Sequence, residues 1–193
     1  MYKYRDILTW PDPKAVSILP TLTFVRITEL LKGKHVSIVK VDDEVFLEME
    51  GEEVLFNEVT SEANSFETWA HFHLNKDNLY ENVIYHGTWL EPMSGIDYTE
   101  DSYFKFYLED LEHNIETTFH SSLNEVGTEF VEKTGFAFHA PLLYIGNNPD
   151  SFVTYIMSSK LGTEKPYGLI IRDVISNSVI KILNSDIVWG KHH

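Results

Sequence analysis

The stretch Lys40-Val41-Asp42-Asp43-Glu44 lies at the centre of the segment that decides the fold. From His35 to Phe56 apolar residues alternate with polar ones, a spacing that is typical of half-buried β-strands. The pairs Asp42-Asp43 and Glu50-Gly51 interrupt this alternation, and residues of these types favour tight turns. The segment therefore predicts a three-stranded β-meander, with Lys40 at a strand end beside the first turn.

The composition is that of a globular protein. Of the 193 residues, 43% are hydrophobic and 23% are charged, which are ordinary values for one folded domain. We therefore predict a single domain over residues 1–193. Cysteine is absent from the sequence, which excludes a disulfide framework and a zinc-thiolate site. No apolar run approaches the roughly 20 residues of a membrane helix, and the N-terminus lacks a signal-peptide core, so we expect a cytoplasmic protein with no membrane partner.

The charge balance is strongly acidic. There are 15 basic and 30 acidic residues, which gives a formal net charge of −15. Such a balance argues against broad electrostatic capture of nucleic acid, because neutralisation of phosphates by lysine and arginine dominates that affinity. It leaves room for a small basic groove within an acidic surface.

Patterns outside the meander predict further helices and strands. Asn64 followed by Glu67 is typical of a helix N-terminus, and Gly135 is a good helix stop. A segment with three prolines before residue 33 favours an extended or turn-rich start before any long element. The predicted helices are Thr28–Leu31, Ser65–Leu74, Leu123 to about Gly135, and Asp150–Leu161 with Val153, Ile156 and Met157 buried; the predicted strands are Asn82–His86 (ending at Gly87), Tyr103–Leu108, Asn114–Phe119, Phe136–Ile145, Gly168–Val174 and Ser178–Leu183. This mixture predicts an α+β fold of antiparallel sheets flanked by helices.

Lys40 is the first candidate for chemistry. A partly deprotonated lysine can attack the α-phosphate of a nucleotide and form a lysyl-nucleotide, and Asp42 would then contact a ribose hydroxyl or steer the leaving group. Taken alone, the same residues are more typical of a solvated strand-end lysine beside an acidic turn.

Six segments in order give this lysine more weight, and they match patterns of one family: Lys-x-Asp-Gly, Gly-Glu-Trp, Phe-Tyr-x-Phe-Asp, Val-Pro-x-Leu-x-x-Gly, Glu-Gly-x-x-x-Arg and a lysine-bearing strand. The corresponding segments are Ile38–Asp43, Val83–Leu90, Phe106–Asp110, Ala140–Gly146, Tyr167–Arg172 and Val179–Ile182. With them the chain resembles the phage-type ATP-dependent RNA ligases and, more widely, the covalent nucleotidyltransferases that include DNA ligases and capping enzymes. The resemblance covers roughly residues 20–183.

This resemblance implies an ATP-grasp-like ligase adenylation core that uses ATP and Mg²⁺. It implies that Lys40 attacks ATP and carries AMP, with Asp42 at the ribose and Lys181 at the phosphates. Arg172 would add charge near the site, and Trp89 would lie beside the nucleotide pocket, unless it is simply a core residue. AMP would then pass to the 5′-phosphate of an RNA end for sealing.

Several family positions differ in this chain. The glycine of the first motif is Asp43, the glutamates of the third and fourth motifs are Thr88 and Tyr167, and the aromatic that stacks on adenine is Glu109. In the family the two glutamates help to hold ribose and a divalent metal, and metal assistance is central to phosphoryl transfer. Two alternatives therefore stay open: a catalytically inactive relative that binds a nucleotide, nucleic acid or protein partner, and a β-rich phage structural or binding protein.

The histidines form a second constellation. His71 and His73 would share one face of a strand and bind a metal there. On the predicted helix they point about 200° apart, so they cannot do so as a pair. The terminal His192-His193 is either a natural end or the remnant of a tag.

Overall fold

The computed structural model describes residues 7–60, 63–92, 97–113, 123–157, 159–162, 165–176 and 178–187. These residues form two compact units. Unit 1 contains Gly33–Glu91 and Tyr103–His139, and unit 2 contains the described residues of Arg5–Lys32, Pro92–Ser102 and Ala140–His193. That the two units act as one domain stays a prediction.

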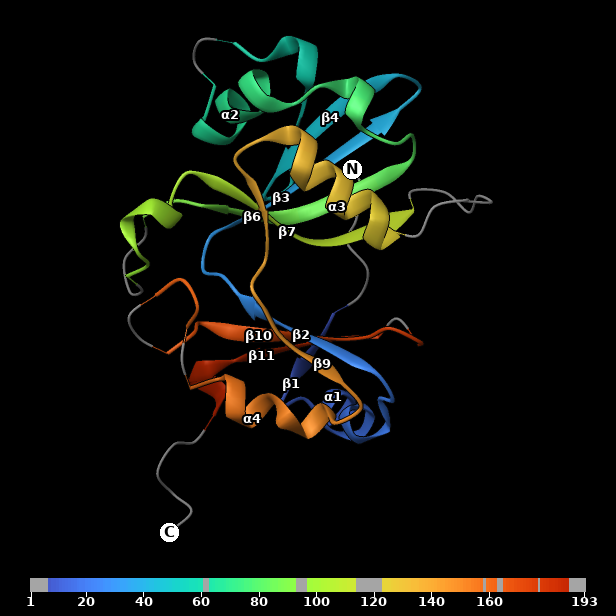
Figure 1. Cartoon of the computed structure of the whole chain (residues 1–193), viewed down its shortest axis with the longest axis vertical. Coiled ribbons are helices and arrows are strands. Elements are labelled where there is room, and N and C mark those ends of the chain that lie inside the picture. Colours follow the sequence, from blue (N-terminus) through green and yellow to red (C-terminus); the bar gives the residue numbers. More distant parts are fainter. Residues whose placement is uncertain are drawn as a thin grey trace. The chain divides into compact units, whose positions relative to one another are not determined.

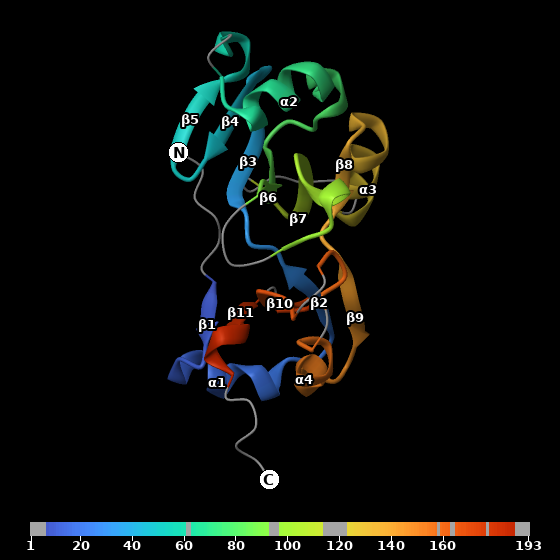
Figure 2. The ribbon, with the colours of Figure 1, turned by 90° about the vertical axis from the view of Figure 1, so that its left-hand side faces the viewer.

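Unit 1 is built on a six-stranded sheet with the order β5-β4-β3-β6-β7-β8 (Figures 1 and 2). Neighbouring strands are antiparallel, except that β8 runs parallel to β7. The strands are β3 (Lys34–Val41), β4 (Glu44–Met49), β5 (Glu52–Leu55), β6 (Val83–Leu90), β7 (Lys105–His113) and β8 (Ala137–His139). The predicted meander is therefore confirmed as β3, β4 and β5.

Left-handed backbone conformations make the two turns of the meander. Asp42 and Asp43 have φ values of 52° and 64°, and Glu50 and Gly51 have values of 49° and 89°. Two-residue hairpins favour such turns because their twist matches that of the flanking strands. Asp tolerates this conformation better than most residues, which explains the acidic pair after Val41.

The predicted end of a strand at Gly87 is wrong, because β6 continues through it to Leu90. The register of β6 against β7 shifts between His86 and Gly87, as in a β-bulge. A Cβ atom on Gly87 would collide with the carbonyl oxygen of Tyr107 and lie 2.7 Å from Phe106 Cζ. Glycine is required here for close approach of two strands rather than for a turn.

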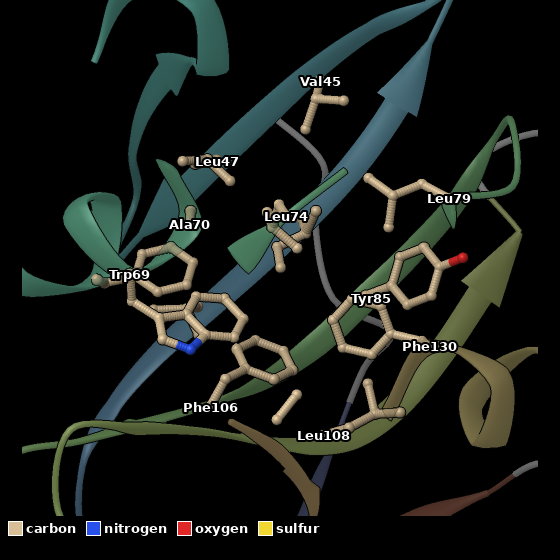
Figure 3. Close-up of a cluster of buried hydrophobic side chains, with 14 of the residues drawn as sticks. Val45, Leu47, Trp69, Ala70, Leu74, Leu79, Tyr85, Phe106, Leu108 and Phe130 are labelled. Carbon is tan, nitrogen blue, oxygen red and sulfur yellow. The ribbon is translucent and has the colours of Figure 1, made fainter. Parts of the chain in front are cut away.

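Two helices cover one face of this sheet. Helix α2 (Ser65–His73) begins with the predicted capping box of Asn64 and Glu67, and α3 (Leu123–Thr134) ends before Gly135, whose φ is 73°. Figure 3 shows their side chains packed on the strands. The ring centroids of Trp69 and Phe106 lie 5.5 Å apart, and those of Tyr85 and Phe130 lie 4.7 Å apart. These rings form the core of unit 1.

Unit 2 is built on a five-stranded sheet with the order β1-β11-β10-β2-β9. Strand β1 runs parallel to β11, and the other pairs are antiparallel. The strands are β1 (Leu8–Trp10), β2 (Val25–Leu30), β9 (Leu142–Gly146), β10 (Gly168–Asp173) and β11 (Val179–Leu183). Helices α1 (Pro13–Ile18) and α4 (Phe152–Tyr155) lie on one side of this sheet (Figure 2), and their apolar residues pack with Val25, Ile27 and Ile171 in a second core. Short 3₁₀ helices in the two units are Leu19–Thr21, Phe56–Glu58, Lys76–Asn78, Glu100–Ser102, Pro149–Ser151 and Asn184–Asp186.

One further prediction near β2 is wrong. Thr28–Leu31 is not a helix, because Val25–Leu30 forms β2 between β10 and β9. The N-terminal segment holds β1, a turn and the six-residue helix α1 before this strand. Pro13 occupies the first turn of α1, where its missing N–H costs nothing.

Two predictions in the last third of the chain are also wrong. Phe136–Ile145 is not one strand, because it divides at Ala140-Pro141 into β8 and β9, which belong to different sheets. Asp150–Leu161 is not one helix, because α4 has only four residues. Ile156 is buried as predicted, but Val153 and Met157 are exposed. The predicted strands Gly168–Val174 and Ser178–Leu183 correspond to β10 and β11, which pair as antiparallel neighbours, and the predicted strand Asn114–Phe119 lies outside the described residues.

In the described part of the chain, the helices are too short or too polar for any of them to cross a membrane.

Candidate functional site

Lys40 lies on β3 just before the first turn of the meander, and only 9% of it is exposed. Its ammonium nitrogen donates to the carbonyl oxygens of Lys76 at 2.9 Å and Leu79 at 3.4 Å. A buried charge needs such partners. The lysine therefore ties the hairpin tip to the segment that precedes β6.

Surrounding polar contacts strengthen this attachment. Asp43 accepts a hydrogen bond from Lys76 Nζ at 2.9 Å, and its backbone N–H donates to Glu81 Oε1 at 2.8 Å. The hydrogen bond from Lys76 lowers the pKa of the exposed Asp43 carboxyl. Asp42 is exposed at the tip of the turn. The structure thus gives Lys40 and its neighbours a structural role, and the nucleophilic role of Lys40 stays a prediction.

Trp89 is a core residue of unit 1. It is 1% exposed and packs with Phe66 and Trp69. Its indole Nε1 donates to Ser65 Oγ and Glu91 Oε1, each at 2.9 Å. These contacts satisfy the donor and support the core interpretation of this residue.

The face of the unit 1 sheet opposite its helices is polar. Ser37 Oγ lies 2.9 Å from His86 Nδ1, and His86 Nε2 lies 3.4 Å from Glu112 Oε2. The Thr88 hydroxyl donates to the Glu109 carboxylate. Two positions where the ligase family has a carboxylate and a stacking aromatic ring therefore hold a hydrogen-bonded threonine–glutamate pair. His86 was not singled out from the sequence as part of this row, although its alternation with the core residue Tyr85 was a usable signal.

Arg172 and Lys181 lie on one face of the unit 2 sheet. Arg172 on β10 is in register with Arg26 on β2 and with Val179 on β11. Because side chains two residues apart on a strand share a face, Lys181 projects on the same side as Val179 and Arg172. The opposite face carries the apolar core with Ile171 and Ile180. Arg26 was not singled out from the sequence, because a helix over Thr28–Leu31 is expected where strand β2 lies.

Lys32 and two tyrosines meet just after β2. The ammonium of Lys32 lies 5.7 Å from the ring centroid of Tyr167, a cation–π distance. The backbone N–H of Lys32 donates to the Tyr98 hydroxyl at 2.9 Å. Tyr167, which stands where the resemblance places a glutamate, therefore contacts a cation of its own chain.

Glu29 is a buried carboxyl that holds a loop of unit 2. It is 1% exposed and accepts hydrogen bonds from Ser159 Oγ at 2.6 Å and from the backbone N–H of Lys160 at 2.7 Å. Burial raises the pKa of Glu29, although these bonds oppose the shift. The carboxyl therefore fixes the loop against β2.

Comparison with known proteins identifies the fold. No family model and no curated protein matches the sequence. Among solved structures, a mutant of Naegleria gruberi RNA ligase with ATP and Mn superposes with a TM-score of 0.72 at 12% identity, over 95% of this chain and 55% of that one. The same ligase with PPi gives 0.69 at 13% identity over 95% and 56%, and a mutant with AMP and Mn gives 0.67 at 14% over 90% and 52%.

The chain has an RNA ligase-like nucleotidyltransferase fold. The α+β architecture expected from the motif order is thereby confirmed. The chain spans about half the length of these ligase structures.

The two positions at which the resemblance places metal-binding glutamates do not carry carboxylates in this chain. Mg²⁺ and similar hard cations need carboxylate or carbonyl oxygens. Thr88 and Tyr167 stand where the resemblance places the two glutamates. The Thr88 hydroxyl donates to Glu109, and the ring of Tyr167 faces the ammonium of Lys32. Within the described ranges, no three histidine or acidic residues are grouped as metal ligands would be. His71 and His73 lie on helix α2, where residues two apart point in different directions.

Proposed function

We propose that this chain is a ligase-like domain that binds a nucleotide, with ATP as its ligand, and does not form a lysyl-nucleotide. The observation that carries the proposal is the set of cations on one face of the unit 2 sheet, in a fold otherwise found in RNA ligase structures with ATP, AMP and PPi. Lysine and arginine are the side chains that bind phosphate groups.

A second alignment of the first family motif with this sequence supports the absence of covalent chemistry. The pattern Lys-x-Asp-Gly ends on glycine, and Leu30-Leu31-Lys32-Gly33 ends on one. Leu30 is in register with Gly168, at the start of the fourth-motif strand. In this placement Leu30 takes the nucleophile position, and an aliphatic side chain cannot attack a phosphate.

Gly33 lies at a position where the packing leaves no space for a side chain, as expected for a glycine that a motif requires. A Cβ atom there would lie 2.5 Å from Thr88 Cγ2 and 2.6 Å from the carbonyl oxygen of Trp89, both on the third-motif strand. Asp43, the corresponding residue in the Lys40 placement, is an exposed turn residue. The close packing of Gly33 therefore supports the placement that ends there.

The alternative function is that of an active RNA ligase. Lys40 would then attack ATP with the help of Mg²⁺, and AMP would pass to a 5′-phosphate RNA end. Its low exposure favours this role, because burial can activate a lysine. The hydrogen bonds to two carbonyls would first have to break.

Labelling distinguishes the two functions. The protein is incubated with α-labelled ATP and Mg²⁺ or Mn²⁺, and label is sought on a denaturing gel, while ATP binding is measured at equilibrium. We expect ATP binding and no covalent label. Label that is lost in Lys40→Ala and kept in Lys76→Ala would establish the active ligase instead. If the protein shows no covalent label and no ATP binding, the nucleotide-binding proposal is overturned.

A further inference from the structure

The net charge of the chain is unevenly divided between its two units. The sequence ranges of unit 1, with Met1–Tyr4 included, contain 6 basic and 20 acidic residues, and those of unit 2 contain 9 and 10. Unit 1 therefore has a formal net charge of −14 and unit 2 has one of −1. Because net charge keeps copies of a protein apart, a second copy of this chain meets far less repulsion at unit 2 than at unit 1.

Strand β9 forms one edge of the unit 2 sheet (Figure 2). In the described part of the chain it pairs with β2 alone, so no other strand pairs with its outer side. Leu142 and Ile145 on this strand are 44% and 48% exposed. None of its five residues is charged, and the sequence has no acidic residue, lysine or arginine from position 134 to position 149. An apolar edge of this kind favours pairing with another strand.

The other edge strands of the two sheets have features that protect them. Strand β5 begins with Glu52 and Glu53, and β1 and β8 have three residues each. Charged side chains and short length are common means of preventing association between sheet edges. Strand β9 has five uncharged residues. A register shift against β2 affects only its N-terminal part, and Tyr144–Gly146 pairs regularly with Val25–Ile27, so a regular part of this edge is available for pairing.

A second copy of the same strand suits this edge. Antiparallel pairing of β9 with β9 about a twofold axis makes each contact twice and closes the assembly as a dimer. The two strands bring no charge to the contact, and the units that carry them are almost neutral. A charged segment of another protein would find no counter-charge among the side chains of β9.

We infer that this chain forms a twofold dimer in which β9 pairs antiparallel with β9 of a second copy. The two five-stranded sheets of unit 2 then form one continuous sheet. Side chains directly opposite each other on such strands have Cβ atoms about 5 Å apart, so the exposed Leu142 and Ile145 gain apolar neighbours from the second copy. The inference is independent of the proposed nucleotide-binding function.

Sedimentation equilibrium of the full chain tests the dimer. We expect the mass to rise with concentration from 22.4 kDa toward twice that value. The rise should fall between about 1 µM and about 1 mM, because one pair of strands is a smaller interface than stable complexes use. A mass that stays at 22.4 kDa throughout this range would overturn the inference.

Lysine substitutions locate the contact, because a lysine on an edge strand opposes pairing. Leu142→Lys and Ile145→Lys should each raise the dissociation constant of the dimer at least about tenfold. The control Val16→Lys adds the same charge at a residue of α1 that is 46% exposed, and it should stay within about twofold of the wild type. Circular dichroism of each variant monitors its folding. Unchanged dimerisation in both β9 variants would place the contact elsewhere and overturn the inference.

Disulfide trapping tests the pairing without adding charge. The sequence has no cysteine, so a single introduced cysteine can form a disulfide only with its copy in a second chain. We place one cysteine at a time over Leu142–Ile145. At least one position should cross-link about tenfold faster than the exposed controls Val16→Cys and Glu52→Cys, because residues beside the twofold axis lie within disulfide reach. Equal rates at all positions would indicate random collisions and overturn the inference.

Discussion

The ammonium group of Lys40 is held by the carbonyl oxygens of Lys76 and Leu79. Replacement by methionine keeps much of the side-chain volume and leaves both carbonyls without this donor. We expect Lys40→Met to lower the free energy of unfolding by about 1–3 kcal/mol, the usual cost of a buried group that loses its partner. Urea denaturation of the wild-type protein and the variant measures this difference in the free energy of unfolding.

The matched control is Lys76→Met. The Lys76 ammonium pairs with the exposed carboxylate of Asp43, and an exposed pair contributes about 0–1 kcal/mol. Equal effects of the two substitutions would contradict a special structural role for Lys40.

Glu29 makes stability depend on pH in a defined direction. Burial raises its pKa in the folded protein above the unfolded value near 4.5, so the folded state holds more protons between those two values. The free energy of unfolding therefore falls as pH rises through that window. Glu29→Gln should remove this slope from urea unfolding measured between about pH 4 and 8. The exposed Glu58→Gln should keep it, and an unchanged slope in Glu29→Gln would show that another group titrates.

At the scale of elements, the capping box of α2 is predicted from the sequence and is present in the structure. The Asn64 side chain accepts from the Glu67 N–H at 2.8 Å, and Glu67 accepts from the Asn64 N–H at 3.0 Å. Asn64→Ala should cost about 1 kcal/mol of stability in thermal or urea unfolding. Asn57→Ala in an exposed 3₁₀ turn is the control. A loss of similar size there would argue against the cap as the cause.

Elements whose turns, caps and pairing strands lie close together in the sequence were predictable. Strands that pair only with distant segments were not. The meander, α2, α3 and the hairpin of β10 and β11 carry their own turns and caps. Strand β2 pairs with β10 and β9 from the far end of the chain, and no turn or partner strand beside it in the sequence marks it, although Val25 to Thr28 alternate apolar and polar residues. Arg26 was missed because it lies on β2, which was not predicted as a strand. Arg172 and Lys181 were found because their motifs lie on β10 and β11, which are neighbours in the sequence. The structure leaves their predicted contacts with a nucleotide as proposals.

At the scale of the whole molecule, two hydrophobic cores share no residue. Phe130 is fully buried in the core of unit 1. Phe130→Ala should cost about 3–5 kcal/mol, and hydrogen exchange should accelerate in unit 1 far more than in unit 2, because separate cores favour separate opening units.

Phe72→Ala removes a ring that is 74% exposed on α2 and should leave exchange in both units nearly unchanged. Equal acceleration of both units in Phe130→Ala would show instead that they unfold together.

The strand order of unit 2 also has a consequence during translation. The ribosome makes β1 and β2 before all strands of unit 1, and it makes β9, β10 and β11 after them. Throughout that interval β2 has neither of its neighbours and exposes two unpaired edges, which favour association with other chains. A nascent chain halted after β8 would therefore hold every strand of unit 1 while β2 still exposes both of its edges to other chains.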